Sequence, residues 1–210
     1  MKTESFEARD CLLAELADGT PVLFRPVMPE DRKRLVAGMT QLSADSRYFR
    51  FFTPLPRLAE EQLRYFTEVD QHNHVAWIAV NPILPEQPGQ GIGRFVRRND
   101  QPTVAEFALT VIDAAQSKGL GTAILAILYL LAWEGGVCCL HGIVLPENRV
   151  VTTWLARLGA KTWFAAGVYE VELPVSRDIS CLPNNPSAER FRSWVERMSG
   201  LRGEQVVHSR

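Results

Sequence analysis

The chain has 210 residues, of which 46% are hydrophobic and 22% charged, and its formal net charge is −1. This composition is typical of a globular protein with one buried core, and the small net charge supplies no basic field for nucleic acid. The four cysteines have no Cys-x-x-Cys spacing and no signal sequence opens the chain, so we expect a cytoplasmic protein without a metal site. The longest apolar run, residues 123–133, is shorter than the roughly 20 residues that cross a bilayer, so no membrane partner is expected.

The first 42 residues predict a β-hairpin followed by a helix. The Asp-Gly pair at 18–19 separates the apolar segments 11–16 and 22–27, a pattern typical of a hairpin. Proline followed by two acidic residues at 29–31 favours the first turn of a helix, which we expect to end near residue 42.

The next stretch combines aromatic and basic residues. Residues 42–52 interleave aromatic side chains with arginines, and two interpretations stay open: a connector packed on the core, or one wall of an acceptor pocket. Residues 57–69 then predict a second amphipathic helix with Leu63 and Phe66 directed inward.

The middle of the chain predicts three strands. Residues 74–80 are typical of a buried strand, and after a proline-rich loop residues 91–98 return antiparallel to it. Residues 103–112 predict the central strand. Strand periodicity places Glu106 on the opposite side of this strand from Leu109 and its odd-numbered neighbours.

Helices and strands alternate in the second half. The expected elements are an almost wholly apolar, buried helix over 122–135, a strand over 138–144, a helix over 149–158 with an apolar face (Val150, Val151, Trp154, Leu155 and Leu158), and two strands over 161–165 and 168–173. This order predicts an α+β fold in α/β/α layers, a mixed sheet with helices on both faces.

The turn between the central strand and the buried helix is the strongest functional signal. It contains Gln116, Ser117, Lys118, Gly119, Leu120, Gly121 and Thr122. Glycines that allow close approach, followed by the N-terminus of a helix, favour the binding of phosphate. A nucleotide P-loop lacks its Lys-Ser/Thr pair here, and a dinucleotide fingerprint lacks its third glycine, since Ile124 occupies that position.

The pattern that remains, Gln-x-x-Gly-x-Gly, resembles the acetyl-CoA pyrophosphate loop of the GNAT superfamily of N-acetyltransferases. The segment 146–148 followed by Gly159 is similar to that family's Asn-(x)10-Gly segment. Residues 42–52, 105–108 and 146–149 look like the bacterial protein-lysine acetyltransferase branch, and the resemblance covers residues 12–173. It implies a mostly antiparallel sheet with a splayed parallel pair of strands in the middle.

The resemblance also implies a function. The expected reaction is direct transfer of an acetyl group from acetyl-CoA to an amine, with a protein lysine as acceptor. A small-molecule amine is the alternative acceptor, and a catalytically weak module that senses acyl-CoA is the alternative function. In this branch Glu106 would be the general base. A tyrosine seven residues after the motif asparagine usually protonates the leaving thiolate, and here that position is Leu155.

The cofactor site that the resemblance implies consists of Leu109, Val111, Gln116, Ser117, Lys118, Gly119, Gly121, Thr122 and Asn148. The oxyanion would bind a backbone N–H near Leu109 or Val111, while Lys118 adds charge beside the pyrophosphate or is simply a solvated loop residue. His141 is interpreted as a structural histidine, and His72 and His74 as structural or acceptor-pocket residues, because no carboxylate or cysteine cluster accompanies them at metal-ligand spacing.

The chain leaves the family pattern after Pro174. We therefore expect a GNAT-like domain over 1–174 and an extension over 175–210. An apolar stripe in the extension predicts one amphipathic helix, with Phe191, Trp194, Val195 and Met198 on one face. This helix packs either on its own domain or on a second copy in a homodimer, and residues 200–210 are expected to fray.

Overall fold

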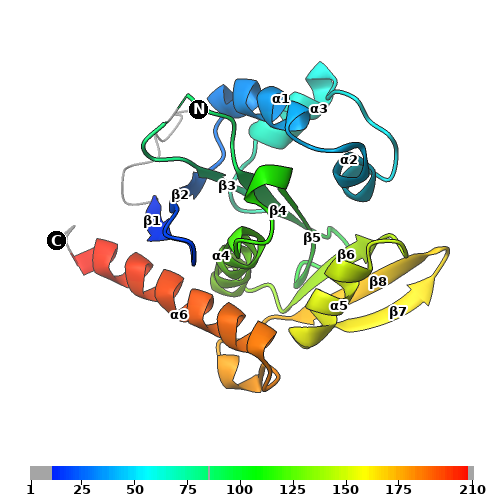
Figure 1. The fold of residues 1–210 in the computed structure, drawn as a ribbon. Helices are drawn as coiled ribbons and strands as arrows, with labels where there is room; N and C mark the ends of the chain where they lie inside the picture. The colour runs from blue at the N-terminus through cyan, green and yellow to red at the C-terminus, as the bar shows by residue number, and fades with distance from the viewer. Residues whose placement is uncertain (1–10, 85, 208–210) are drawn as a thin grey trace.

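A computed structural model describes residues 11–84 and 86–207, with side chains as far as residue 200 (Figure 1). The strands are β1 (Leu12–Glu15), β2 (Pro21–Pro26), β3 (His74–Val80), β4 (Gly91–Arg97), β5 (Val104–Val111), β6 (Cys139–Val144), β7 (Lys161–Ala165) and β8 (Val168–Pro174). The helices of this described part are α1 (Arg32–Thr40), α2 (Ala44–Phe51), α3 (Glu60–Thr67), α4 (Leu120–Glu134), α5 (Arg149–Arg157) and α6 (Pro186–Val207). Short 3₁₀ turns precede α1 and α4.

The eight strands form one sheet in the order β1-β2-β3-β4-β5-β6-β8-β7. Every neighbouring pair is antiparallel except β5 and β6, which are parallel. The expected α+β fold, a mixed and mostly antiparallel sheet with one parallel pair, is therefore confirmed.

Helices cover both faces of the sheet, with α1, α2 and α3 on one side and α4 and α6 on the other (Figure 1). Strand β4 shows how closely α4 packs, because a Cβ atom on Gly93 would lie 2.4 Å from Ile124 Cγ2. Side chains alternate along a strand, so Gly93 and Phe95 define what we call the α4 face, and Arg94 and Val96 define the α2 face.

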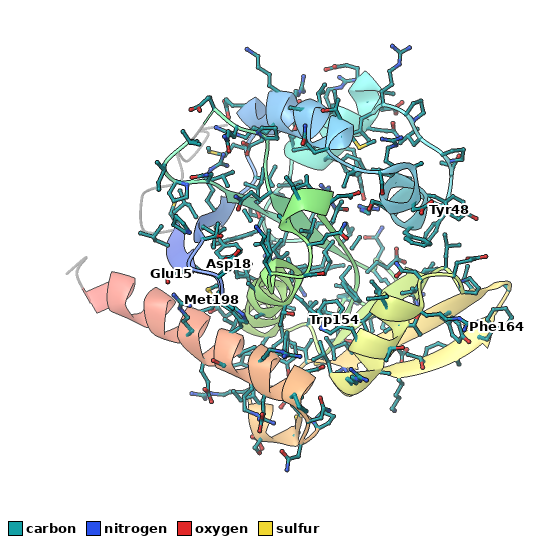
Figure 2. All side chains as sticks on the ribbon, viewed as in Figure 1. Glu15, Asp18, Tyr48, Trp154, Phe164 and Met198 are labelled. Atoms are coloured by element: carbon teal, nitrogen blue, oxygen red, sulfur yellow. The ribbon has the colours of Figure 1, made fainter. Side chains whose placement is uncertain are left out.

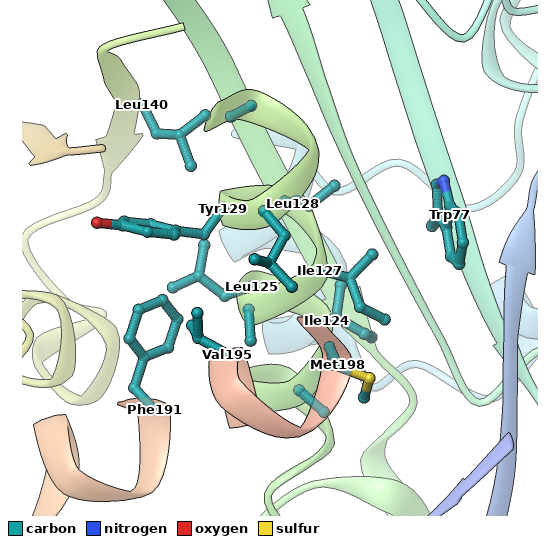
Figure 3. Close-up of a cluster of buried hydrophobic side chains, with 14 of the residues drawn as sticks. Trp77, Ile124, Leu125, Ile127, Leu128, Tyr129, Leu140, Phe191, Val195 and Met198 are labelled. Carbon is teal, nitrogen blue, oxygen red and sulfur yellow. The ribbon is translucent and has the colours of Figure 1, made fainter. Parts of the chain in front are cut away.

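Helix α4 is the centre of the core. Most of its side chains are buried, as its uniformly apolar sequence predicts. Phe191, Val195 and Met198 of α6 pack against it, and Figure 3 shows Phe191 beside Tyr129 and Met198 near Ile124. The Tyr129 and Phe191 rings meet edge to face with centroids 5.4 Å apart. The apolar stripe predicted for α6 is confirmed, and it packs on the chain's own α4.

Within residues 42–52, for which the sequence left a connector or a pocket wall open, residues 44–51 form helix α2, and part of this stretch lines a cleft. Helix α2 begins after Ser43, whose Oγ accepts a hydrogen bond from the backbone N–H of Ser46 at 3.1 Å. A serine in this position is a strong N-cap because it satisfies an N–H that has no partner inside the helix. The aromatic and basic residues concealed this signal.

Three helix details also differ from the expectation. Helix α4 begins at Leu120, two residues earlier than expected, because Gly119 adopts a positive φ of 87° and acts as its N-cap. Val150, expected on the apolar face of α5, is 81% exposed. Helix α6 continues to Val207 instead of fraying from residue 200, since glycine weakens a helix without ending it, and residues 208–210 lie outside the described part.

Candidate functional site

The parallel strands β5 and β6 separate after a short paired segment. They pair from Val104 with Cys139 to Glu106 with His141. Beyond this point β5 stays paired with β4, and β6 stays paired with β8. Gly142 faces the gap, and a Cβ atom there would lie 2.7 Å from the ring of Phe107. The expected splayed pair is thus present, with Phe107 inserted at its base.

The inner edge of β5 carries backbone groups that no described strand pairs. The N–H of Ile112 points towards β4 and donates a hydrogen bond to the carbonyl of Gln90, just before that strand, at 3.0 Å. Backbone groups alternate along a strand, so those of Leu109 and Val111 point into the gap. The Val111 carbonyl accepts a hydrogen bond from Gln116 Nε2 at 3.1 Å, which leaves the backbone groups of Leu109 open to a ligand.

The loop before α4 presents a set of bare backbone donors. Ser117 and Gly119 both have positive φ, 62° and 87°. The N–H groups of residues 117–119 bond no carbonyl of the described chain. The first N–H groups of α4 have no intrahelical acceptor either, and the helix dipole adds positive charge there. This geometry is suited to a phosphate group.

A hydrogen-bond network fastens this loop to α2. The carboxylate of Asp113 accepts hydrogen bonds from Ser46 Oγ at 2.8 Å and from the backbone N–H of Ser43 at 3.1 Å. Burial opposes ionisation of Asp113, but these hydrogen bonds outweigh it and lower the pKa of the carboxyl. Gln116 Nε2 donates to Ser46 Oγ and to Asp113 Oδ1, both at 3.3 Å. The amide group of Gln116 therefore ties the loop together.

Glu106 is exposed. It lies on the α2 face, because its register partner is Val96, which defines that face. His141 lies beside it across the parallel pair, and His141 Nε2 is 2.5 Å from Glu170 Oε2. His141 Nδ1 is buried without a hydrogen-bond partner in the described chain. The sequence predicted a structural role for His141. It lies beside Glu106 only because β5 and β6, which precede and follow α4 in the chain, pair with each other.

Helix α5 forms another wall. Asn148 caps it, since its Oδ1 accepts the Val151 N–H at 3.3 Å, which leaves the side-chain amide NH2 group for a ligand. Leu155 lines the same wall and is only 1% exposed. Among the described residues that line the cleft, the one tyrosine is Tyr65, on α3.

The hairpin turn and α6 contribute residues that the sequence did not single out. Lys118 Nζ lies 3.4 Å from Asp18 Oδ2, at the turn between β1 and β2. Arg197 donates to the Glu15 carbonyl at 2.9 Å, and its guanidinium lies 5.1 Å from the centroid of the Trp194 ring. Figure 2 shows Asp18 beside α4 and Trp154 on α5. No motif marked α6 as part of a site, because the resemblance ends before it.

Two arginines lie on the α2 side. Arg94 is 6% exposed, and it bonds His74 Nε2 at 3.0 Å and the Phe66 carbonyl at 3.3 Å. Its guanidinium is 4.3 Å from the centroid of the Phe66 ring, and that of Arg50 is 5.9 Å from the same centroid. Burial, followed by the charge of Arg50, lowers the pKa of Arg94 to about 9. Burial, followed by the charge of Arg94, lowers the pKa of His74 to about 4.

All of these parts open into one cleft of about 1780 Å³. Every residue that the sequence proposed for the site lines it, namely Glu106, Leu109, Val111, Gln116, Ser117, Lys118, Gly119, Gly121, Thr122 and Asn148. Their roles stay predictions. In residues 11–84 and 86–207 the structure contains no cluster of three or more side chains suited to a metal ion, and none of the described helices is long and apolar enough to cross a membrane.

Comparisons with known proteins agree with this geometry. No protein-family model matches the chain. The chain is 32% identical over 140 residues to the acetyltransferase Pat of Mycolicibacterium smegmatis, which is 65% of this chain and 40% of that relative. It is 27% identical over 150 residues to an acetyltransferase of Pseudomonas aeruginosa, covering 71% of this chain and 80% of that protein. The crystal structure of the GNAT domain of S. lividans PAT matches with a TM-score of 0.74 and 28% identity, over 81% of this chain and 99% of that domain.

In its splayed sheet, in the loop before α4 and in these likenesses, the chain resembles the GNAT class of acetyltransferases. It spans about 40% of the length of the M. smegmatis relative. It resembles in particular the acetyltransferase domains of bacterial protein-lysine acetyltransferases, and the GNAT domain of S. lividans PAT is one of its structural matches. The resemblance indicated by the motifs is thereby confirmed.

Proposed function

We propose that the chain transfers an acetyl group from acetyl-CoA directly to an amine, with a protein lysine as the acceptor. One observation carries this proposal: the bare donors of the loop, the open edge of β5 and the carboxylate of Glu106 all line the same cleft. A phosphate-bearing thioester and a basic amine need these three features together.

The residues fit acetyl-CoA in two places. The N–H groups of residues 117–119 and the first turn of α4 would bind the pyrophosphate, and Lys118 would add a positive charge beside it. The backbone groups of Leu109 and Val111 point into the gap where a pantetheine chain would lie. When bound, acetyl-CoA supplies the thioester carbonyl carbon.

The residues of the chain would then handle two changes of charge. A lysine amine has a reference pKa of about 10.4, so it arrives protonated, and Glu106 would accept that proton directly or through water. The free amine forms the new C–N bond, and the N–H of Leu109 would donate to the carbonyl oxygen as negative charge develops there. The C–S bond would then break to release a thiolate, and the attacking nitrogen would lose its second proton to water. Leu155 offers the thiolate no proton, but a thiol with a reference pKa of about 8.5 leaves with water as proton source.

The position of Leu155 supports a second candidate, a module that binds acyl-CoA with little or no turnover. Leu155 is buried on the α5 wall, and no tyrosine of α5 lines the described cleft. Such a module would report acyl-CoA to a partner through binding alone.

The test combines binding with turnover. Calorimetric titration of the purified chain with acetyl-CoA and with dephospho-CoA measures affinity, and thiol release on lysine peptides and amines measures transfer. The comparison is between wild type, Glu106→Gln and the control Glu172→Gln, a strand glutamate on the same face that does not line the cleft. We expect binding in all three proteins and a loss of thiol release of about a hundredfold in Glu106→Gln alone.

Binding without release from any acceptor would favour the sensor. Equal loss in both glutamate variants would reject Glu106 as the base. Absence of acetyl-CoA binding would overturn the proposed function.

A further inference from the structure

Arg50 and Arg94 are cationic side chains without a counter-charge in the described chain. No carboxylate of residues 11–84 and 86–200 forms an ion pair with either guanidinium. Arg50 also has no hydrogen bond to these residues, and its contacts are with the rings of Phe51 and Phe66. A buried charge usually has a partner of opposite sign, because leaving water is costly. The two guanidinium groups therefore lack an anionic partner within the described residues.

The groups around the pair do not neutralise it. Arg94 bonds the neutral carbonyl of Phe66 and the ring of His74, which its low pKa keeps uncharged near neutral pH. The ring of Tyr65 lies beside His74 with centroids 4.9 Å apart, and this side chain brings a hydroxyl and no carboxylate. The Asp70 carboxylate accepts backbone N–H groups of residues 72–74, so its hydrogen bonds go to its own loop.

The pair lies beside the proposed base. Arg94 is the register partner of Ala108, and Val96 is the partner of Glu106, so Arg94 and Glu106 share the α2 face. Glu106 and Ala108 are two residues apart on β5, which corresponds to about 7 Å along the strand. Both arginines also line the cleft. An anionic group bound by them would lie a few bond lengths from an amine at Glu106.

The charge balance indicates what kind of acceptor fits. A simple ammonium ion entering this end of the cleft meets two cations and one carboxylate, so repulsion opposes its binding. An acceptor that carries a carboxylate close to its amine removes this repulsion. Guanidinium groups bind carboxylates with two parallel hydrogen bonds, a strong and directional interaction.

We propose that Arg50 and Arg94 form a subsite for a carboxylate of the acceptor, on the α2 face beside Glu106. This inference rests on the proposed function, because it assumes that the acceptor amine binds at Glu106. The carboxylate has two chemical sources: the α-carboxylate of a free amino acid, or an aspartate or glutamate next to the modified lysine in a peptide.

The decisive experiment uses acceptors that differ only in the carboxylate. Lysine is compared with cadaverine, its decarboxylated form, and lysine peptides with a neighbouring aspartate are compared with the same peptides containing asparagine. We measure kcat/KM for thiol release with wild type, Arg50→Gln and the control Arg64→Gln. Arg64 is an exposed arginine on α3 that does not line the cleft.

Wild type and Arg64→Gln should favour the acid member of at least one pair by roughly tenfold or more, the usual size of a charge-assisted hydrogen bond. In Arg50→Gln this ratio should fall towards one. The preferred pair identifies the source of the carboxylate. Equal rates within both pairs in wild type, or an unchanged ratio in Arg50→Gln, would overturn the subsite.

A second measurement separates this inference from the proposed function. Calorimetric titration with succinate needs no turnover, and we expect heat of binding in wild type that is lost in Arg50→Gln. If thiol release fails for every acceptor while succinate binding depends on Arg50, the subsite stands and the acetyltransferase proposal falls. If succinate binds wild type and Arg50→Gln equally or binds neither, the subsite is rejected. Arg94→Lys, checked for folding by circular dichroism, repeats the test with the more deeply buried arginine.

Discussion

Ser46 Oγ lies 2.8 Å from Asp113 Oδ1, a hydrogen bond that joins the first turn of α2 to the loop between β5 and α4. The same carboxylate accepts the backbone N–H of Ser43, the residue that caps α2. The wall of the cleft that carries Arg50 is therefore attached to the loop proposed to bind pyrophosphate.

Asp113→Asn should loosen this attachment. The substitution removes the charge that Ser43, Ser46 and Gln116 share as donors, so we expect a loss of about 1 kcal/mol in the free energy of unfolding at pH 7. The folded protein lowers the pKa of Asp113, so this contribution is present above the ordinary aspartate pKa and disappears as the pH falls through the lowered value. Urea unfolding of wild type and Asp113→Asn at pH 7 and pH 3 measures both effects. The same difference between the proteins at both pH values would contradict the role of the charge.

His74 should make stability depend on pH in a higher range than Asp113 does. Its pKa is about 4 in the folded protein and 6.5 ordinarily, so the folded state favours the neutral ring. The stabilisation is complete above pH 6.5 and is lost as the pH falls from 6.5 towards 4. Urea unfolding between pH 7 and pH 4.5 should show a smaller decline in His74→Gln, which keeps an acceptor for Arg94. The exposed His72 serves as control, and His72→Gln should decline as wild type does. Identical declines in all three proteins would refute the prediction.

Gly119→Ala should impair the loop more than the fold. Space does not forbid the methyl group, because a Cβ atom there would meet nothing within 4 Å. The positive φ of 87° does disfavour alanine, at a cost of about 1 kcal/mol. We expect a modest fall in stability and a larger fall in acetyl-CoA affinity, measured by calorimetry, because the N–H groups would change direction. Gly200→Ala in α6 is the matched control and should leave affinity unchanged. Wild-type affinity in Gly119→Ala would show that the loop donors do not bind the cofactor.

Phe191→Ala should destabilise the whole chain. The ring is fully buried against Tyr129, and removing such a side chain costs about 3 to 5 kcal/mol. Urea unfolding should show one transition at lower denaturant, with Glu189→Gln on the exposed side of α6 close to wild type. A wild-type midpoint would mean that α6 folds independently of α4. The division into 1–174 and 175–210 stays a prediction, and this experiment measures how far the two parts depend on each other.

Much of the fold was predictable because its strands are apolar runs bounded by glycine and proline. Residues 74–80 coincide with β3 and residues 161–165 with β7, and the other strands differ from the expectation by a residue or two at their ends. The uniformly apolar sequence of α4 likewise predicted its burial. Local patterns fix local structure well when burial and periodicity agree.

The residues of the site were predictable only where they belong to a sequence motif. The loop residues and Glu106 follow one another along the chain, so the resemblance found them together. Arg50 and Arg94 meet on the ring of Phe66 from α2 and β4, and no local pattern marks such a meeting. His141 reaches Glu106 only through the register of the parallel strands, and Arg197 reaches Glu15 only through the packing of α6. These neighbours depend on tertiary structure, which local sequence patterns do not specify.

The burial of most of α4 has a consequence for the loop at its start. A helix held between the sheet and α6 has little freedom to shift or to unwind at its N-terminus. The donors of residues 117–119 are therefore held in their orientation by the core before any anion arrives. A phosphate that binds there would meet a site that is already ordered, so little conformational entropy would be lost on binding.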